Sequence, residues 1–307
     1  EQTLNRFLPS VITQKTLLRM GVNLADVQNK RTNLNAQEIG DPATRAAQWK
    51  RYDRNPVFDE AEMQLIIKTG VNDLTAMQLS DGGWGWFSGY GEYSSAHTTA
   101  QVVHGLTVAI SNDVPVLPDV LARGVEWLKQ HQQEELAKLR EGDWRREHPT
   151  ELKDRKAEYR MSASNTDAFV AFVLAEKDAN DPAMTDYLYR DRGDLSVYAK
   201  ALTGLVLHFQ KDVPRRDMVL RNIEQFLEQD DENQTAWLRM PQNSWWYWYG
   251  SENEAMARYL QLLLKANPKS ETAPKLVKYL LNNRKHGTYW NSTRDTALVV
   301  EAMADYI

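Results

Sequence analysis

The chain has 307 residues, of which 42% are hydrophobic and 26% charged, and its formal net charge is −5. These values fit one large domain or two with a sizeable core, and an acidic balance without basic clusters argues against nucleic-acid binding. The sequence contains no cysteine, which excludes disulfides, thiolate zinc sites and a cysteine nucleophile within these residues.

Helical periodicity runs along nearly the whole chain. The first stretch, EQTLNRFLPSVITQKT, carries apolar side chains at Leu4, Phe7, Leu8, Val11 and Ile12, which is helical spacing. The stretches with such spacing are 2–20, 59–78, 97–111, 117–140, 165–177, 182–190, 195–210, 214–228, 253–266, 272–284 and 294–306. Their longest apolar runs, such as AFVAFVLA, fall far short of the ~18 residues that a membrane span requires. Because the first helix starts with almost no lead-in, we expect the chain to be a fragment of a much larger multidomain protein.

Two classes of helix alternate along the sequence. One class is nearly apolar and rich in small residues, as in AHTTAQVVHGLTVAI and TDAFVAFVLAE, whereas the other is amphipathic, as in ARGVEWLKQHQQEELAKL and APKLVKYLLNNR. A helix that is apolar on most sides is buried, and a helix with one polar face covers it. The alternation therefore predicts an all-α fold, an α/α toroid of about six helical hairpins closed into a ring, with residues 1–307 as a single domain.

The loops that precede the apolar helices also repeat. Trp290 lies seven residues before Ala297, and Trp248 lies seven residues before Ala255. The segment DGGWGWFSGYGEYSS has the same plan, lengthened by a glycine-rich insert after Trp84. Each aromatic loop is followed by Ser, Thr, Asn or Asp residues suited to cap a helix and then by an apolar helix. Such recurrence is typical of an array of repeated hairpins.

These features together resemble the thioester domain of the alpha-macroglobulin and complement family, most closely that of the bacterial alpha-macroglobulins. Family members carry Cys-x-Glu-Gln at the start of an inner helix, and the bacterial sequences continue much like EQTLNRFLPSV. The loop LSDGGWGWFSG is similar to the Gly-Trp turn of the family, although squalene cyclases and prenyltransferases share such turns. The all-helical plan matches the α/α toroid of the family over the whole chain.

The resemblance implies a specific chemistry. Gln2 would supply the acyl side of an internal thioester formed with loss of ammonia, and Glu1 would be its neighbour in the motif. The cysteine of the motif would lie two residues before Glu1, so this fragment alone cannot form the bond. The resemblance further implies a broad-spectrum protease inhibitor that traps its target and captures it covalently by single-use acyl transfer, not an enzyme with turnover.

The same resemblance implies where the protein acts and with what. The expected partners are the attacked proteases and other domains of the same full-length chain, and the expected location is the periplasm, the cell envelope or the extracellular space. No cofactor, metal or nucleic acid is expected.

Some family members place a histidine near the thioester, where it favours hydroxyl targets. The first candidate for this role is His148 in RREHPTE, and the second is His97 at the start of AHTTA. Neither has flanking residues that match a family motif, and the plainer alternatives are a surface-loop histidine and a helix N-terminal histidine in a polar pocket. His104 and His208 fall within apolar helices, which predicts core positions.

The alternative function is an α/α-toroid enzyme acting on polysaccharide or isoprenoid substrates in a tryptophan-lined cavity. The aromatic block at 245–249 would stack on such substrates, or else fill gaps between hairpins. Acidic residues near the starts of inner helices are Asp81, Glu92, Asp167 and Glu254, of which helix capping explains the last two. No phosphate loop, His-Glu-x-x-His or Gly-x-Ser-x-Gly motif is present. The enzyme hypothesis requires a deep axial pocket with converging carboxylates, whereas an axis filled by Leu, Val and Phe would argue against it.

Overall fold

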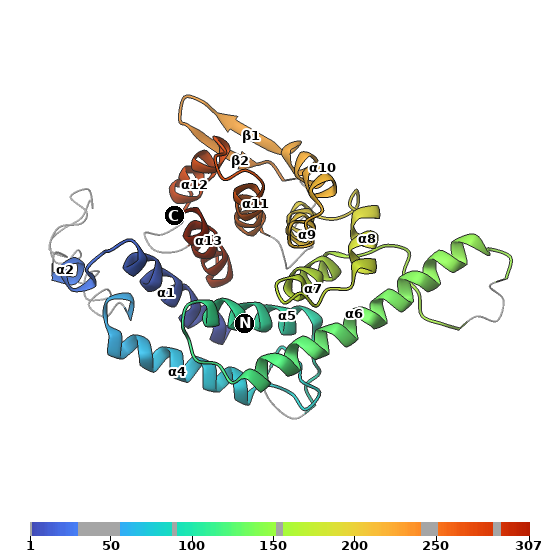
Figure 1. Ribbon diagram of the computed structural model, residues 1–307, viewed down its shortest axis with the longest axis horizontal. Helices are drawn as coiled ribbons and strands as arrows, with labels where there is room; N and C mark the ends of the chain where they lie inside the picture. Colours follow the sequence, from blue (N-terminus) through green and yellow to red (C-terminus); the bar gives the residue numbers. More distant parts are fainter. Residues whose placement is uncertain (1, 30–55, 88–90, 152–155, 241–250, 285–289) are drawn as a thin grey trace.

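The computed structural model describes residues 2–29, 56–87, 91–151, 156–240, 251–284 and 290–307. Six helices form an inner ring (Figure 1): α1 (Gln2–Arg19), α5 (Ala96–Ser111), α7 (Asn165–Ala175), α9 (Val197–Phe209), α11 (Glu252–Ala266) and α13 (Thr293–Tyr306). Each packs against the next, and α13 packs against α1. The predicted closed ring of inner helices is therefore confirmed.

Outer helices cover the ring. They are α4 (Glu60–Ala76), α6 (Pro118–Glu147), α8 (Pro182–Arg190), α10 (Val213–Glu224) and α12 (Thr272–Asn282). Each packs on the inner helix that precedes it, as α4 does on α1 and α10 on α9. Within the described residues this makes five complete hairpins, because no outer helix follows α13. Two short elements, α2 (Leu24–Asn29) and the 3-10 helix η2 (Pro56–Phe58), lie between α1 and α4.

Small residues let the inner helices approach one another closely. A Cβ atom added to Gly105 of α5 would fall 2.2 Å from Leu4 of α1, and one added to Gly204 of α9 would fall 2.5 Å from Leu262 of α11. Such distances are far below van der Waals contact, so these glycines belong to the helix interfaces. The small-residue composition that distinguished the inner helices in the sequence thus reflects their packing.

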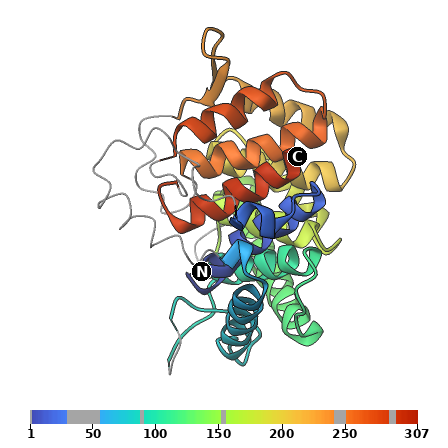
Figure 2. The ribbon, with the colours of Figure 1, turned by 90° about the vertical axis from the view of Figure 1, so that its left-hand side faces the viewer.

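The inner helices all begin at the same rim of the ring. Five of them start with a serine N-cap whose side chain accepts a backbone N–H of the first turn, namely Ser95, Ser164, Ser196, Ser251 and Ser292. In Figure 2 the N-terminus of the chain lies at one end of the ring helices and the C-terminus at the other. We call these two ends the N-terminal rim and the C-terminal rim.

Two tryptophan loops have the same geometry, as the repeated plan of the loops predicted. Trp84 and Trp290 are buried, and each indole Nε1 donates a hydrogen bond of 2.8 Å to the carbonyl ten residues earlier, at Leu74 and Leu280 respectively. Each indole thereby ties its loop to the preceding outer helix. These two rings fill gaps between hairpins, and the aromatic block at 245–249 lies outside the described residues.

Two helix ends differ from the predicted ones by more than two residues. The helix predicted at 117–140 continues to Glu147 and extends beyond the ring (Figure 1). The helix predicted at 214–228 ends at Glu224, after which β1 (Leu227–Asp230) and β2 (Thr235–Leu238) form an antiparallel hairpin. Trp237 of β2 stacks on Tyr279 of α12, with ring centroids 5.3 Å apart. The hairpin covers α12, a tertiary contact that no local pattern announces.

Candidate functional site

A pocket of about 600 Å³ opens at the N-terminal rim. It lies where α1, α5 and α13 begin, beside the glycine- and tryptophan-rich loop. Gln2 and Asn5 come from α1, Thr98 from α5, Arg294 from α13 and Trp86 from the loop. Helix N-termini present unpaired backbone N–H groups and partial positive charge. The rim pocket therefore suits a group that develops negative charge on oxygen.

Gln2, the predicted acyl residue, lines this rim pocket. It is the first residue of α1, and its side chain is exposed. Its motif neighbour Glu1 lies outside the described residues. Its acyl-transfer role stays a prediction.

His97 lies beside the rim pocket, in the first turn of α5. Its ring is 8% exposed and stacks on Trp86, with centroids 6.4 Å apart, and packs against Phe169 at 5.4 Å. Burial, reinforced by the positive charge of Arg294, lowers the pKa of His97 from 6.5 to about 3. The imidazole is therefore uncharged at neutral pH and only weakly basic.

His148, the first-ranked candidate, is placed differently. It follows the last turn of α6, stacks on Trp144 with centroids 4.5 Å apart, and has its Nδ1 atom 2.9 Å from the Trp144 carbonyl. The end of α6 projects away from the ring, far from the chain's N-terminus (Figure 1). The ranking of the two histidines is therefore reversed, because the unforeseen length of α6 carries His148 away from Gln2.

Arg294 is held rigidly in the rim pocket. Its Nε and Nη2 atoms pair with the two carboxylate oxygens of Glu254, which is itself buried in the first turn of α11. Glu254 also accepts the backbone N–H of Ser251, completing a capping box. Asp295, next to Arg294, accepts hydrogen bonds of 2.9 Å from both Ser251 and Asn253. The N-termini of α11 and α13 are thus fastened together, which fixes the guanidinium in place.

Asn5 is the other polar residue of the rim pocket that the sequence did not single out. It is 6% exposed and sits on the apolar side of α1. Its Oδ1 atom is buried and has no hydrogen-bond partner among the described residues. The sequence signal that could have identified Asn5 is a polar residue on the apolar side of the helix, within LNRFL. Such a residue is unusual in a buried position.

The aromatic loop forms one wall of the rim pocket. Trp86 is 50% exposed and Phe87 is 80% exposed. Asp81 supports the loop by accepting hydrogen bonds from Ser94 Oγ at 2.7 Å and from Trp127 Nε1 at 3.0 Å. Side chains of this loop are available to cover an occupant of the pocket.

Each of the four acidic residues considered for glycoside chemistry has a structural role. Asp81 anchors the aromatic loop, and Glu92 accepts the backbone N–H of Trp86 at 2.8 Å. Asp167 and Glu254 complete the capping boxes of α7 and α11, as predicted. Each of these carboxylates thus has hydrogen-bond partners of its own.

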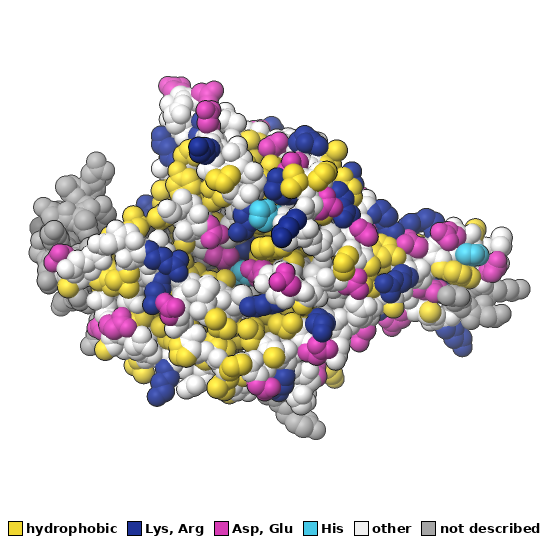
Figure 3. Space-filling model, viewed as in Figure 1, with side chains coloured by type: hydrophobic (Ala, Val, Ile, Leu, Met, Phe, Trp, Pro, Cys, Tyr) yellow, Lys and Arg dark blue, Asp and Glu magenta, His cyan; other side chains and the backbone are white. Residues whose placement is uncertain are grey.

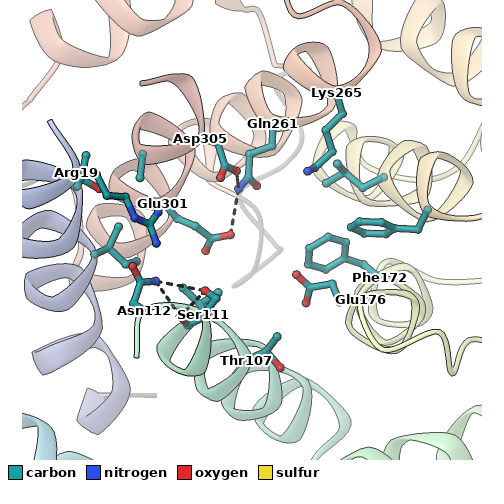
Figure 4. Close-up of a pocket in the computed structure, with 16 residues that line it drawn as sticks. Arg19, Thr107, Ser111, Asn112, Phe172, Glu176, Gln261, Lys265, Glu301 and Asp305 are labelled. Carbon is teal, nitrogen blue, oxygen red and sulfur yellow. Dashed lines mark hydrogen bonds between the residues drawn. The ribbon is translucent and has the colours of Figure 1, made fainter. Parts of the chain in front are cut away.

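A second pocket lies on the ring axis at the C-terminal rim. Its volume is about 340 Å³, and the last turns of all six inner helices line it. Figure 4 shows the carboxylates of Glu176 and Glu301 pointing into it, with Asp305, Lys265 and Arg19 around them. Acidic and basic side chains also meet around the centre of this face in Figure 3. The axis is therefore not filled by Leu, Val and Phe alone, and the pocket contains the converging carboxylates that the enzyme hypothesis requires.

Those carboxylates belong to a buried ion cluster. His104 places Nδ1 2.8 Å from Glu176 and Nε2 3.0 Å from Glu301, and Arg258 Nη1 donates to Glu301 at 3.0 Å. Burial alone would lower the pKa of His104, but Glu176 and Glu301 outweigh it and raise that pKa from 6.5 to about 9. Arg258 and His104 hold the pKa of Glu301 well below its usual range despite burial. The two carboxylates are therefore neutralised ion-pair partners, which does not favour acid–base catalysis.

Of the two histidines predicted for the core, only His104 is fully buried. His208 is half-buried, and its Nδ1 atom lies 3.4 Å from Arg216 Nη1. Its position near the C-terminal end of α9 leaves one side open, so the core prediction for His208 was wrong.

The described residues show neither a metal site nor a membrane span. The described part of the chain contains no cluster of His, Asp or Glu side chains arranged to hold a metal ion. None of its helices combines the length and apolar character needed to cross a bilayer.

Comparison with known sequences finds one family. The sequence model of the A-macroglobulin TED domain, the thioester domain, matches residues 45–306. The chain is 26% identical over 248 residues to alpha-2-macroglobulin of Thermotoga maritima, and 27% identical over 252 residues to an alpha-2-macroglobulin homolog of Nostoc sp.. These matches cover 80% and 81% of this chain and 12% of each relative. The chain thus spans only about an eighth of the length of the curated relatives it matches.

Solved structures share the fold. Escherichia coli alpha-2-macroglobulin activated by porcine elastase superposes with a TM-score of 0.60 at 18% identity, covering 99% of this chain and 22% of that one. Salmonella alpha-2-macroglobulin reacted with methylamine superposes with a TM-score of 0.58 at 18% identity, covering 98% and 17%. At such identities the likeness establishes the helical ring and not its chemistry.

Proposed function

The chain belongs to the A-macroglobulin thioester-domain family, and on that premise we propose that its Gln2 side chain supplies the acyl group of an internal thioester used to capture proteases. The observation that carries the proposal is the position of Gln2 in a pocket of polar and aromatic side chains at the N-terminal rim. The chain contains no cysteine, so the sulfur would come from a residue outside it. Condensation of that thiol with the Gln2 carboxamide forms the C–S bond and releases ammonia.

The capture step is one acyl transfer. A target amine uses its lone pair to form a C–N bond with the Gln2 acyl carbon, the C–S bond breaks, and the amine proton passes to the departing sulfur. Negative charge develops on the carbonyl oxygen as the amine attacks. Arg294 and the N–H groups of helix N-termini at this rim are suited to stabilise that charge. The reaction consumes the thioester, so each molecule acts once and does not turn over.

The aromatic wall supports protection of the thioester before use. A thioester is hydrolysed when water reaches it, and large aromatic side chains exclude water from an adjacent group. Trp86 and Phe87 line the rim pocket, and His97 stacks behind Trp86. We assign these three side chains to shielding the acyl group.

The properties of His97 also bear on the kind of target. A histidine that assists hydroxyl attack must be a competent nucleophile or base, and a pKa of about 3 makes His97 a poor one. His148 lies at the far end of α6 and is not proposed to take part. The proposed targets are therefore amines, such as the lysine side chains of an attacking protease.

The wider setting follows from the family and is part of the proposal. The full-length protein would inhibit proteases by trapping them, and other domains of the same chain would surround this one. The expected location is the periplasm, the cell envelope or the extracellular space. Cell fractionation with detection of the native protein tests the location, and a purely cytoplasmic signal would contradict it.

The decisive experiment uses the full-length protein with its natural residues before Glu1. Peptide mass spectrometry is expected to show loss of one ammonia and, after treatment with methylamine, a methylamide at Gln2. Gln2→Ala should abolish the label, whereas the matched variant Gln64→Ala, in an exposed glutamine of α4, should keep it. Absence of both ammonia loss and labelling in the folded wild-type protein would refute the proposal.

A further inference from the structure

The aromatic loop returns past Trp86 on its way to α5. Its outgoing segment is 82–87, and its returning segment is 91–95. Gly91 has a φ of 84°, a left-handed conformation that suits glycine. The next residue, Glu92, accepts the backbone N–H of Trp86 at 2.8 Å with its Oε1 atom. A carboxylate is a stronger acceptor than an uncharged oxygen, so this contact holds the backbone of a residue that lines the rim pocket.

Gly85 provides the space in which the Glu92 carboxylate lies. A Cβ atom added to Gly85 would fall 2.2 Å from Cγ of Glu92 and 2.3 Å from its Oε1 atom, far below van der Waals contact. The φ of Gly85 lies outside the left-handed region, so space and not backbone conformation accounts for this glycine. Because the side chain of Glu92 is flexible, an alanine at this position would displace the carboxylate and spare the backbone. A hydrogen bond and a missing side chain thus indicate the same role for Glu92.

The base of the loop is held by other contacts. The backbone N–H of Ser95 donates to the carbonyl of Trp84 at 2.9 Å, and Ser94 Oγ donates to Asp81 at 2.7 Å. The indole of Trp84 is buried, whereas Trp86 is 50% exposed. A half-exposed side chain is confined by less packing than a buried one, so its position depends more on local hydrogen bonds. Loss of the carboxylate described above should therefore displace Trp86 and leave the base of the loop in place.

We propose that Glu92 is a positioning residue that keeps Trp86 in the wall of the rim pocket and thereby slows hydrolysis of the thioester before use. The inference rests on the proposed function, because it concerns the acyl group of Gln2. In hydrolysis the oxygen of water forms a C–O bond with the acyl carbon, and the C–S bond breaks with its electrons on sulfur. One water proton passes to the sulfur, which leaves a free thiol and a carboxylic acid. Glu92 does not touch the reacting atoms and acts only through Trp86.

The test measures the rate of thiol release in buffer from the full-length protein, per folded molecule. Glu92→Ala should raise that rate about threefold, which corresponds to one hydrogen bond at an exposed site. Trp86→Ala removes the shielding ring itself and should raise it more, about tenfold. In the Trp86→Ala background, Glu92→Ala should add nothing, because the residue through which it acts is gone. Glu92→Gln keeps an acceptor oxygen and should restore most of the protection.

A second variant tests the same contact from the other side. Gly85→Ala displaces the carboxylate without removing it, so it should also raise the rate of thiol release about threefold. Combined with Glu92→Ala, it should raise the rate no further than either change alone. The matched control is Glu126→Ala, in a glutamate of α6 that pairs with Lys129, and it should leave the rate unchanged.

The outcomes separate this inference from the proposed function. A wild-type protein that forms no thioester overturns both. A wild-type protein that is labelled by methylamine at Gln2, together with a Glu92→Ala variant that releases thiol at the wild-type rate, overturns only the role of Glu92. Additive effects of Glu92→Ala and Trp86→Ala do the same, since Glu92 would then act without Trp86. Should Glu92→Ala fail to fold, Gly85→Ala decides by the same criteria.

Discussion

The two ends of the ring are built from the same six helices but carry different chemistry. At the N-terminal rim, serine caps and the Glu254–Arg294 pair surround a pocket lined by an exposed glutamine and a buried asparagine. At the C-terminal rim, His104, Glu176, Arg258 and Glu301 form a cluster in which opposite charges are paired across the axis. We propose the first end as the place of reaction, whereas the second connects α5, α7, α11 and α13.

The difference shows how one parallel arrangement of helices produces two environments. Every inner helix brings its positive N-terminal end to one rim and its negative C-terminal end to the other. Arg19 and Lys265, in the last turns of α1 and α11, offset the helix ends there, and His104 and Arg258 pair with the carboxylates from the middle of their helices. Oxyanion chemistry is therefore suited to the N-terminal rim and not to the axial pocket.

The largest expected effect is the dependence of stability on pH. The histidine at each end of the ring should act in the opposite direction to the other. His104 has its pKa raised from 6.5 to about 9, so its contribution is full below pH 6.5 and is lost as pH rises to about 9. His97 has its pKa lowered from 6.5 to about 3, so stability is lost as pH falls from 6.5 towards 3. These shifts correspond to roughly 3 kcal/mol of unfolding free energy for His104 and roughly 5 kcal/mol for His97.

Urea denaturation across this range tests the assignment. His104→Gln should flatten the alkaline limb of the stability curve, and His97→Phe should flatten the acid limb. If either variant flattened the other limb instead, the assignment of the alkaline limb to His104 and of the acid limb to His97 would be wrong.

Removal of one axial carboxylate should be the next largest effect. Glu301→Gln leaves Arg258 without its charged partner and should lower the free energy of unfolding by about 3–5 kcal/mol, as for other broken buried pairs. Asp305→Asn, one turn later on α13, is the matched control and should change it much less. Methylamine labelling of Gln2, measured per folded molecule, should stay the same in both variants. A changed labelling rate would mean that the ends are coupled.

Loss of the aromatic wall should affect only the reactive end. Trp86→Ala should raise the rate of thiol release in buffer about tenfold, equivalent to about 1.4 kcal/mol, because water gains access to the acyl group. Tyr93→Ala, in a more exposed aromatic residue of the same loop that does not line the rim pocket, is the control. Equal rates in both variants would remove the shielding role from Trp86.

The smallest predicted effect compares two tryptophans of the same design. Trp84→Phe and Trp290→Phe each remove one indole hydrogen bond of 2.8 Å to a backbone carbonyl. Each should destabilise the protein by about 1–3 kcal/mol, near the lower end, through a buried carbonyl left unpaired. Thermal unfolding should give similar losses for both. Clearly unequal losses would show that the two loops are not equivalent units.

Much of the fold was predictable because its signals are local. The bounds 182–190 were predicted residue for residue, since Asp181 caps that helix and Pro182 begins it. The β1–β2 hairpin was missed because its strands are short and owe their stability to Trp237 packing on Tyr279. The extension of α6 to Glu147 was missed because its last turns are polar and carry little periodic signal.

The site was predictable in part. Gln2 was found through a motif, and the weaker histidine candidate, His97, turned out to be the one beside it. Asn5 and Arg294 were not singled out, because neither belongs to a motif and their significance depends on the pocket they share. The axial cluster was missed for the same reason, since His104, Glu176 and Glu301 are far apart in sequence and meet only when the ring closes.

The sequence by itself determined the helices, their division into inner and outer classes, and the serine caps, because periodicity and capping act over a few neighbouring residues. Only the tertiary structure decided which side chains share a pocket and which charges are paired. Those outcomes depend on ring closure, which brings the first helix against the last, and on burial, which sets the pKa values of His97 and His104 in opposite directions.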